Sequence, residues 1–588
     1  MSIPRNLALF AENITSGGVL NTTGGGTGTT TLTGTGNLVL SNNPVLVAPA
    51  LGTIASGVAT NLTGLPLTTG VTGILSVANG GSGVSTSTGT GNNVLSNNAT
   101  LVAPVLGTPA SGVATNLTGL PLTTGVTGTL PIANGGTNAT TATGSAGQLQ
   151  YLTSLTGGSA RTYQAKFADV TSVKDFGAKG DGTTDDTTAV QAAITAGGFI
   201  YFPPGTYKLS SQITYTMPAS FSSINIFGAG AEVTRLVWAA GGGMIINHIG
   251  QYNSTRVRDL CFQVSAANTG TALQLYQTVG VANPADSAPS EVTNCIFRGS
   301  DAYAGVYCWA VGVQAYSVSN VNFNGCGFFG TNASAGIGVL LSSISGTYPG
   351  GVYNFQSCFF NFINYGIDYG NYVQGVTVNQ CNFTGAQQGI IALASLTALD
   401  QLVVTNSQFE CSINGILTAT AIPNTQISGC LFIPGLASSN TGINLQQGGL
   451  FTIVGNSFNP LGTPTGATGI SIGATVNSWP GTIVGNTIYG MSNAGIVLGA
   501  SASRILVQSN TYLTNATNVV NSGSNNLIYD GGYAYTVSIL PTVGSYPYVG
   551  LFVTDATVTA SGNFGAAVTG GGANKVPVYS DGTNWRIG

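Results

Sequence analysis

The sequence predicts an all-β protein whose central part is a parallel β-helix, and two repeating columns of residues carry this prediction. In the first column an aliphatic residue or Phe is followed three positions later by Cys, Ser or Asn, and five positions later by an aromatic residue or Ile. It recurs every 23 to 32 residues, as Val292-Cys295-Phe297, Phe323-Cys326-Phe328, Phe355-Cys358-Phe360, Val378-Cys381-Phe383, Val404-Ser407-Phe409, Ile427-Cys430-Phe432, Ile453-Asn456-Phe458, Ile483-Asn486-Ile488 and Val507-Asn510-Tyr512. The second column is a Gly-Ile dipeptide: Gly336-Ile337, Gly366-Ile367, Gly389-Ile390, Gly415-Ile416, Gly442-Ile443, Gly469-Ile470 and Gly495-Ile496.

The first column describes two short strands joined by a tight bend. Its aliphatic residue ends one strand and its aromatic residue starts the next, both pointing inward. Gly, Asn or another small polar residue precedes the Cys position in most repeats, as Asn294 and Gly325 do, and such residues tolerate the positive φ that a bend needs. Because one repeat cannot bury its apolar residues alone, neighbouring repeats stack into a continuous column.

The composition excludes several classes of protein. Charged residues make up only 5%, while Gly occurs 87 times, which suits short strands and turns. The net charge of −4 and the absence of a basic patch argue against nucleic acid as a partner, and against tight binding of strongly anionic polymers. Five of the eight Cys share one position of the column, which indicates stacked small side chains rather than disulfides.

No metal or other cofactor is expected, because the chain has a single histidine, His248, and no Cys-x-x-Cys motif. No run of about 18 apolar residues is free of Gly, Thr, Asn or Pro, so we expect no membrane insertion. The N-terminus lacks a basic start followed by a long apolar core, so no secretory signal is expected.

We expect five segments in chain order. Residues 1–20 form a docking segment around Leu7, Leu9 and Phe10, or an unstructured start. Residues 21–150 contain a repeat of about 55 residues and lie in a stretch without charge between Glu12 and Arg161, which predicts an oligomeric fibre shaft or, alternatively, a disordered stalk. Residues 151–225 form a linker and a cap, residues 226–535 the β-helix, and residues 536–588 a small β module.

Three stretches resemble known protein families. The repeated sequences of the predicted shaft, such as LGTPASGVATNLTGLPLTTGVTGTLPIANGGTNATTA, resemble the repeat region of bacteriophage tail fibres. VKDFGAKGDGTTDD, AVQAAI and IYFPPGTYKLSS look like the start of the right-handed β-helix of the pectate lyase superfamily found in phage tailspikes. VPVYSDGTNWRIG looks like a C-terminal module of phage tail proteins.

These resemblances imply a location and partners. They imply a homotrimer in the virion tail, synthesised in the host cytoplasm, which docks through its N-terminus to a phage tail or baseplate protein. They also imply that Asp181, Asp185 and Asp186, in the capping segment, are structural. Capping chemistry points the same way, because Asp185 or Asp186 precedes a short helix expected over residues 187–195.

The glycan-binding candidates are aromatic residues in insertions between the repeats. Insertions in a solenoid become loops on one face, and Tyr and Trp offer flat apolar faces with a polar edge that suit sugar rings. The predicted binding residues are Tyr303, Tyr307, Trp309, Tyr316 and Tyr348. The alternative interpretation is that these side chains cover the bases of the loops or pack against a neighbouring chain.

The catalytic candidates are Asp301, Asp368 and Glu410. Hydrolysis of a glycosidic bond needs two carboxyl groups at about 5 Å or about 6.5–9.5 Å. Asp301 lies within the aromatic insertion, and Asp368 and Glu410 each follow an inward residue and so point outward. The alternative interpretation is that they are isolated acidic residues on a solvated face. A lyase is disfavoured because there is no Lys between Lys208 and Lys575 to hold a uronate.

Three functions therefore remain open. The first is a tail fibre or tailspike that attaches the phage to its host by binding a surface polysaccharide through the β-helix. The second is a tailspike depolymerase that hydrolyses this polysaccharide. The third is a secreted bacterial β-helix adhesin, which the missing signal sequence and the phage-like repeats disfavour.

Overall fold

The computed structural model describes residues 156–588 except 221, 251, 278–287, 332, 344–349, 394–398, 436–439, 476–479 and 531, together with Ala78 and the backbone of residues 150 and 151. The docking segment predicted at residues 1–20 lies outside the described residues. So does the shaft predicted at residues 21–150, apart from Ala78 and Gln150, the first residue of a short strand. Both stay predictions.

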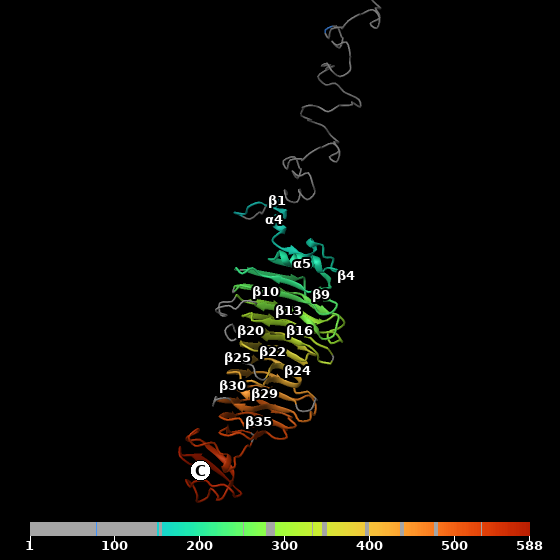
Figure 1. Cartoon of the computed structure of the whole chain (residues 1–588). Helices are drawn as coiled ribbons and strands as arrows, with labels where there is room; N and C mark the ends of the chain where they lie inside the picture. The colour runs from blue at the N-terminus through green and yellow to red at the C-terminus, as the bar shows by residue number, and fades with distance from the viewer. Residues whose placement is uncertain are drawn as a thin grey trace, which may run out of the picture. The chain divides into compact units, whose positions relative to one another are not determined.

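The predicted fold is confirmed, because the described chain winds into a right-handed parallel β-solenoid (Figure 1). One sheet of 14 strands contains β3 (Thr171–Ser172), β5 (Phe199–Phe202), β8 (Ser222–Gly228), β11 (Asn253–Arg258), β14 (Ser290–Thr293), β17 (Val321–Asn324), β20 (Gly350–Gln356), β23 (Val373–Asn379), β25 (Gln401–Thr405), β27 (Asn424–Ser428), β30 (Leu450–Val454), β33 (Gly481–Val484), β36 (Ile505–Gln508) and β39 (Leu527–Ile528).

The second sheet has 23 strands and runs twice through most coils. Its strands are β4 (Asp181–Asp185), β6 (Gly205–Leu209), β7 (Ile213–Thr216), β9 (Thr234–Trp238), β10 (Met244–His248), β12 (Cys261–Val264), β13 (Thr269–Gln277), β15 (Ile296–Gly299), β16 (Trp309–Tyr316), β18 (Gly327–Phe329), β19 (Ile337–Ser342), β21 (Phe359–Asn361), β22 (Tyr365–Tyr369), β24 (Asn382–Ala392), β26 (Gln408–Thr418), β28 (Leu431–Phe432), β29 (Thr441–Gly448), β31 (Ser457–Phe458), β32 (Thr468–Thr475), β34 (Thr487–Tyr489), β35 (Ala494–Ser501), β37 (Thr511–Leu513) and β38 (Val519–Asn521).

The solenoid sheets begin before the boundary expected at residue 226, because β3 to β8 already pair within them. The early coils lack the Phe column and so carry no periodic signal. Outside the two sheets lie β1 (Gln150–Tyr151), β2 (Arg161–Thr162), α4 (Tyr163–Phe167), η4 (Val173–Phe176), α5 (Thr187–Ala196) and η6 (Val537–Ile539). No helix in the described part of the chain is long and apolar enough to span a membrane.

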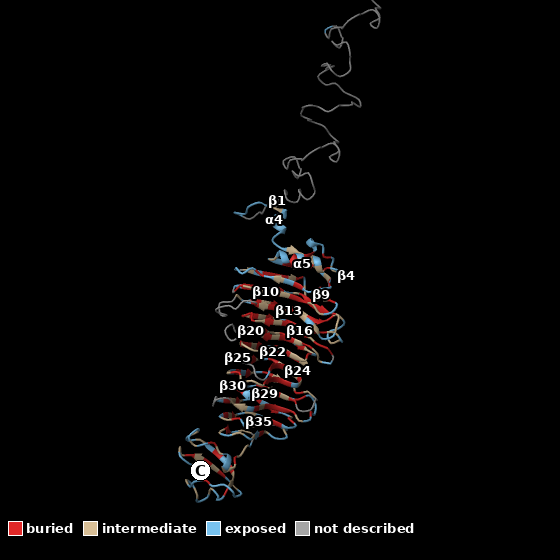
Figure 2. Cartoon of the chain, viewed as in Figure 1, coloured by how far each residue is buried: buried red, intermediate tan, exposed pale blue. Residues whose placement is uncertain are grey.

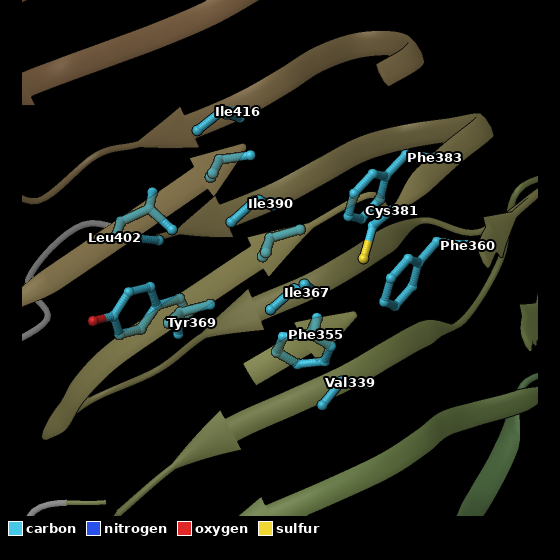
Figure 3. Close-up of a cluster of buried hydrophobic side chains, with 14 of the residues drawn as sticks. Val339, Phe355, Phe360, Ile367, Tyr369, Cys381, Phe383, Ile390, Leu402 and Ile416 are labelled. Carbon is cyan, nitrogen blue, oxygen red and sulfur yellow. The ribbon is translucent and has the colours of Figure 1, made fainter. Parts of the chain in front are cut away.

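The predicted aromatic column forms a continuous stack inside the solenoid. Neighbouring rings from Phe262 to Phe458 lie 4.6–5.1 Å apart and nearly parallel, with interplanar angles of 4–18°. Ile488 and Tyr512 continue the register beyond Phe458. Figure 3 shows Phe360 and Phe383 beside a parallel column of aliphatic side chains. The parallel register, with one Phe per coil, places each ring over the next. Figure 2 shows the buried residues along the strands.

The glycine of the second column makes room for this stack. A Cβ on Gly366, Gly389 or Gly415 would lie 2.5–2.7 Å from a Phe ring and 2.5 Å from a glycine carbonyl oxygen of the next coil. One of the predicted pairs is wrong. Gly338-Val339 occupies the position assigned to Gly336-Ile337, since Val339 pairs with Ile367 while Ile337 pairs with Tyr365 and stays half-exposed. The local sequence Gly-Ile-Gly-Val offers the same motif in two registers.

The predicted bends have the expected conformation and a hydrogen-bonded ladder beside them. Residues before the Cys position adopt positive φ, including Asn294 (50°) and Gly325 (62°). The buried side chain that follows donates to the carbonyl two residues earlier, as Cys295 does to Thr293 and Asn486 to Val484. All eight cysteines are free and buried, which confirms their structural role. Burial raises the pKa of the Cys295 thiol to about 12, so this group stays protonated.

The capping segment closes the N-terminal end of the core. Helix α5 buries Val190, Ala193 and Ile194 completely. The Asp186 carboxylate accepts from the backbone N–H groups of Lys179 and Gly180 at 2.6 and 2.9 Å.

The other two acidic residues of this segment are bonded in a similar way. Asp185 accepts from the backbone N–H of Thr187 and from Ser210 Oγ. Asp181 accepts from the backbone N–H groups of Thr183 and Thr184 at 2.8 Å each. The predicted structural role of these carboxylates is confirmed.

A small antiparallel sheet follows the last coil. It consists of β40 (Gly550–Ala556), β41 (Asn574–Ser580) and β42 (Trp585–Ile587). Tyr535 joins the two parts, because its hydroxyl accepts from the N–H of Ile528 and donates to the carbonyl of Asn526, while its backbone N–H donates to the carbonyl of Phe552 on β40.

Replacing Asn486 by Ala is expected to lower the free energy of unfolding by about 2 kcal/mol or more. The Asn486 amide donates to the carbonyls of Ile453 and Val484, and its oxygen accepts from the N–H of Asn456, so the change leaves buried polar groups unpaired. Thermal unfolding followed by circular dichroism measures the effect. Asn459→Ala, at an exposed position, is the control, and equal midpoints for the two variants would contradict a structural role of the ladder.

Candidate functional site

The structure places the three catalytic candidates on different coils. Asp301 is exposed in the loop after β15, and its carboxylate accepts from the N–H of Val306 at 2.7 Å. Partial burial disfavours ionisation of Asp301, but bonds from Val306 and neighbouring backbone N–H groups outweigh it and lower its pKa. Asp368 is half-buried on β22, and burial raises its pKa to about 6. Glu410 is half-buried on β26.

Glu410 does not lie at glycosidase distance from either of the other two carboxylates. In the sheet register, β15 and β26 are four strands apart, through β18, β21 and β24. At about 4.8 Å per strand this amounts to about 19 Å. Asp368 pairs with Ile391 and Glu410 with Thr384, seven residues away on β24, which is about 23 Å of chain along the strand. The predicted catalytic cleft of Asp301, Asp368 and Glu410 is therefore not assembled within one chain.

The predicted aromatic residues divide into three groups. Tyr303 is 44% exposed in the loop after β15, and Tyr307 lies half-buried in the same loop. Tyr316 is half-exposed on β16, where its ring stacks on Tyr276 at 4.7 Å. Tyr348 lies outside the described residues.

The prediction of Trp309 as a sugar platform is wrong. Trp309 is the first residue of β16 rather than part of a loop, and it is only 3% exposed. Its indole N–H donates to the carbonyl of Phe262 at 3.0 Å, and its ring packs edge-on against Trp238. The periodic pattern does not show where the insertion ends and the next strand begins, so a core residue was assigned to the loop.

An exposed aromatic strip runs across the coils beside Tyr303. We define it as Tyr303, Phe329, Phe359 and Phe362. The rings of Tyr303 and Phe329 meet edge to face at 4.7 Å, and Phe329 leans over Gly327, the register partner of Phe359. Phe359 and Phe362 are 49% and 40% exposed. The strip is a largely apolar surface that spans neighbouring coils of the solenoid.

A row of polar side chains continues the outer face of the same strands beyond the strip. Phe359 pairs with Asn382, which pairs with Gln408 on the following coil. The parallel row next to it runs from Asn361 through Thr384 to Glu410. Amides and hydroxyls that alternate outward in this way offer both donors and acceptors to a ligand lying across the coils.

An ionic cluster borders the other end of the strip. Arg298 is only 7% exposed, and its guanidinium bonds to Glu232 at 3.3 Å and to the carbonyl of Gly299 at 2.9 Å. When the Gln263 amide oxygen faces Arg298, it accepts from Nη1 and Nη2 at 3.1 and 2.7 Å. Arg235 also pairs with Glu232 at 3.3 Å. These bonds satisfy the buried charge of Arg298.

Tyr303 is held in place by this cluster. Its hydroxyl donates to Glu232, and its ring lies 4.8 Å from the guanidinium carbon of Arg298. Burial and the bond to Glu232 raise the pKa of Tyr303 to about 12. The cluster therefore fixes one end of the aromatic strip.

Most of the aromatic strip and the ionic cluster is not apparent from the sequence. Phe362 does not adjoin a column residue, and nothing in the chain order marks it as exposed. Glu232 and Arg298 are 66 residues apart in sequence. One signal was available: Phe329 and Phe359 each adjoin a column Phe, so alternation along a strand places them outside.

No three His, Cys, Asp or Glu side chains of the described residues gather where they could hold a metal ion.

Comparison with known proteins gives a family match for part of the solenoid. Residues 170–417 match the family described as rhamnogalacturonase A/epimerase, pectate lyase-like. Among curated proteins, alginate lyase 7 of Azotobacter vinelandii is 46% identical over 74 residues, which cover 11% of this chain and 9% of the relative. The mannuronan C5-epimerase AlgE6 of the same organism is 37% identical over 110 residues, covering 16% of this chain and 13% of the relative. The chain thus spans a small fraction of these relatives.

Solved structures of similar fold include phage proteins. Tailspike protein 3 of bacteriophage CBA120 is 15% identical, with a TM-score of 0.45 over 75% of this chain and 73% of that one. Residues 170–417 contain the aromatic strip, and this part of the chain is a right-handed parallel β-solenoid that matches the pectate lyase-like family model.

Proposed function

We propose that this protein is a phage tail fibre or tailspike that attaches the virion to its host by binding a cell-surface glycan on the aromatic strip. The exposed strip, continued by amide and hydroxyl side chains across successive coils, is the observation that carries the proposal. Aromatic side chains with an exposed face stack on the apolar faces of sugar rings, and neighbouring amides bond to hydroxyl groups. A polysaccharide can extend over several coils of such a surface.

The assignment to a virion tail is supported by the sequence. The repeated sequences of the predicted shaft resemble tail fibre repeats, and they precede the solenoid in the chain. In this proposal the N-terminal residues dock to a tail or baseplate protein, three copies assemble, and the solenoid presents its binding face to the host.

Attachment without cleavage is favoured over depolymerisation. The catalytic candidates sit on different coils, and Asp301 is bonded to its own loop. Glu410 is the candidate that lies on the same face as the aromatic strip. A depolymerase on this face would need a second carboxylate from elsewhere, such as a neighbouring copy.

Replacing Phe359 by Ala is expected to weaken binding to host surface polysaccharide about tenfold, because one stacking contact of about 1–1.5 kcal/mol is lost. Surface plasmon resonance on the immobilised polysaccharide measures this. Phe552→Ala removes another exposed phenylalanine, 60% exposed against 49% for Phe359, from the C-terminal sheet and serves as the control. Equal affinities of the two variants would contradict the assignment of the strip.

Incubation of the purified protein with the same polysaccharide is expected to yield no new reducing ends and no shorter chains. Reducing-end assay and size-exclusion chromatography provide the measurement. Cleavage by the wild type would refute attachment without hydrolysis. Loss of this cleavage in the variant Asp301→Asn, Asp368→Asn or Glu410→Gln would then identify the catalytic residue.

Replacing Asp368 by Asn is expected to stabilise the protein at neutral pH while leaving glycan affinity unchanged. The pKa of Asp368 is raised to about 6 by burial, above its ordinary value of 3.8, so the folded state binds the proton more tightly than the unfolded state. The stability from this group is fully present below about pH 4 and is lost as pH rises through 6. The variant should therefore show a smaller fall of the unfolding midpoint between pH 4 and 7, measured by scanning calorimetry. An unchanged pH dependence would refute this.

A further inference from the structure

We infer that the ligand of the aromatic strip is an uncharged polysaccharide, one whose sugars present apolar faces or apolar substituents such as methyl and acetyl groups. This inference rests on the proposed glycan binding and specifies its substrate class. It is carried by the distribution of charge around the strip, which differs sharply from what a polymer of acidic sugars requires.

The solenoid beyond Arg298 contains no positively charged side chain for more than 200 residues. From residue 299 to residue 503 the sequence has no Lys, Arg or His, and its acidic residues are Asp301, Asp368, Asp400 and Glu410. This stretch therefore has a formal charge of −4, and it includes Phe329, Phe359 and Phe362. A carboxylate on a bound sugar would find no ionic partner there and would be repelled by Glu410 at the end of the polar row.

At the opposite end of the strip, the buried cation Arg298 is engaged within the protein. Arg298 is buried and bonds to Glu232, to the carbonyl of Gly299 and to Gln263, while the Tyr303 ring lies over it. Arg235 shares the carboxylate of Glu232, while its side chain is 41% exposed. A buried arginine that is already bonded in this way holds Tyr303 in position and has little capacity left for an anionic ligand.

The side chains that would contact the ligand are apolar or neutral. Phe359 and Phe362 have no polar edge, so they suit the hydrophobic face of a sugar or an apolar substituent. Asn382, Thr384 and Gln408, along the following coils, donate and accept hydrogen bonds without discriminating by charge. Recognition on this surface therefore depends on shape and hydroxyl pattern.

The first test probes the whole protein against a panel of purified bacterial surface polysaccharides, half of them uncharged and half bearing uronic acids or phosphate. Each uronate polymer is also presented after carbodiimide-mediated reduction of its carboxyl groups. Binding confined to uncharged polymers, with a Kd that changes less than twofold between 50 and 500 mM NaCl, is the expected result. Binding confined to acidic polymers and lost on carboxyl reduction would overturn the inference while leaving glycan attachment intact. Binding to neither class would overturn both.

The second test compares the affinities of two variants for the polysaccharide that the protein binds. Gln408 is half-buried on the outer face, and Gln408→Glu and Gln408→Lys introduce opposite charges of similar size there. For an uncharged ligand the two affinities should agree within threefold. A Kd more than tenfold tighter for Gln408→Lys at 50 mM NaCl would overturn the inference.

The strip has one competing occupant, a second copy of this chain. Analytical sedimentation of the Phe359→Ser variant, together with its polysaccharide affinity, distinguishes a second copy from the glycan as the occupant of the strip. An unchanged oligomer with weakened polysaccharide binding is expected, whereas a changed oligomer with unchanged binding would make the strip a subunit contact and overturn the inference.

Discussion

The structure depends on the vertical stacking of like side chains in parallel coils. The centroid of a Phe ring in one coil lies about 5 Å from that of the Phe in the next. The spacing of about 4.8 Å between hydrogen-bonded strands falls within the range of centroid distances at which aromatic rings stack. Once the rings are in register, the strands that carry them are in register as well, and a slip of one residue would turn every Phe outward. The glycine beside each ring and the bend before each Cys position follow from this constraint.

The same constraint shapes the outer surface. Each coil presents its outward residues directly above those of the preceding coil, so side chains distant in sequence form continuous rows. The aromatic strip and the polar row of Asn382 and Gln408 arise in this way. The ionic cluster of Glu232 and Arg298 differs, because it joins a loop between β8 and β9 to the loop that carries Tyr303, and it fixes a ring that the regular strands do not hold.

The sequence predicted the core better than the surface, and the individual residues show why. Column positions such as Phe383 and Asn486 repeat at a regular interval and are mutually constrained, so a periodic pattern identifies them. The prediction for Trp309 is wrong because an aromatic residue at the end of an irregular insertion has no periodic neighbours in the sequence. The pattern therefore does not identify it as a core residue. Asp301, Asp368 and Glu410 were selected by residue type, but which outward residues meet depends on the number of coils between them.

The sequence by itself determined the solenoid, the positions of its bends and the structural role of its cysteines and capping aspartates, because these depend on local periodicity and on stacking of identical units. It also set the charge of the stretch from residue 299 to residue 503. Only the tertiary structure decided which side chains share the outer face, that Arg298 is buried beneath Tyr303, and that the acidic residues remain apart. Those facts depend on coil register and loop paths, which bring together residues that no sequence interval relates.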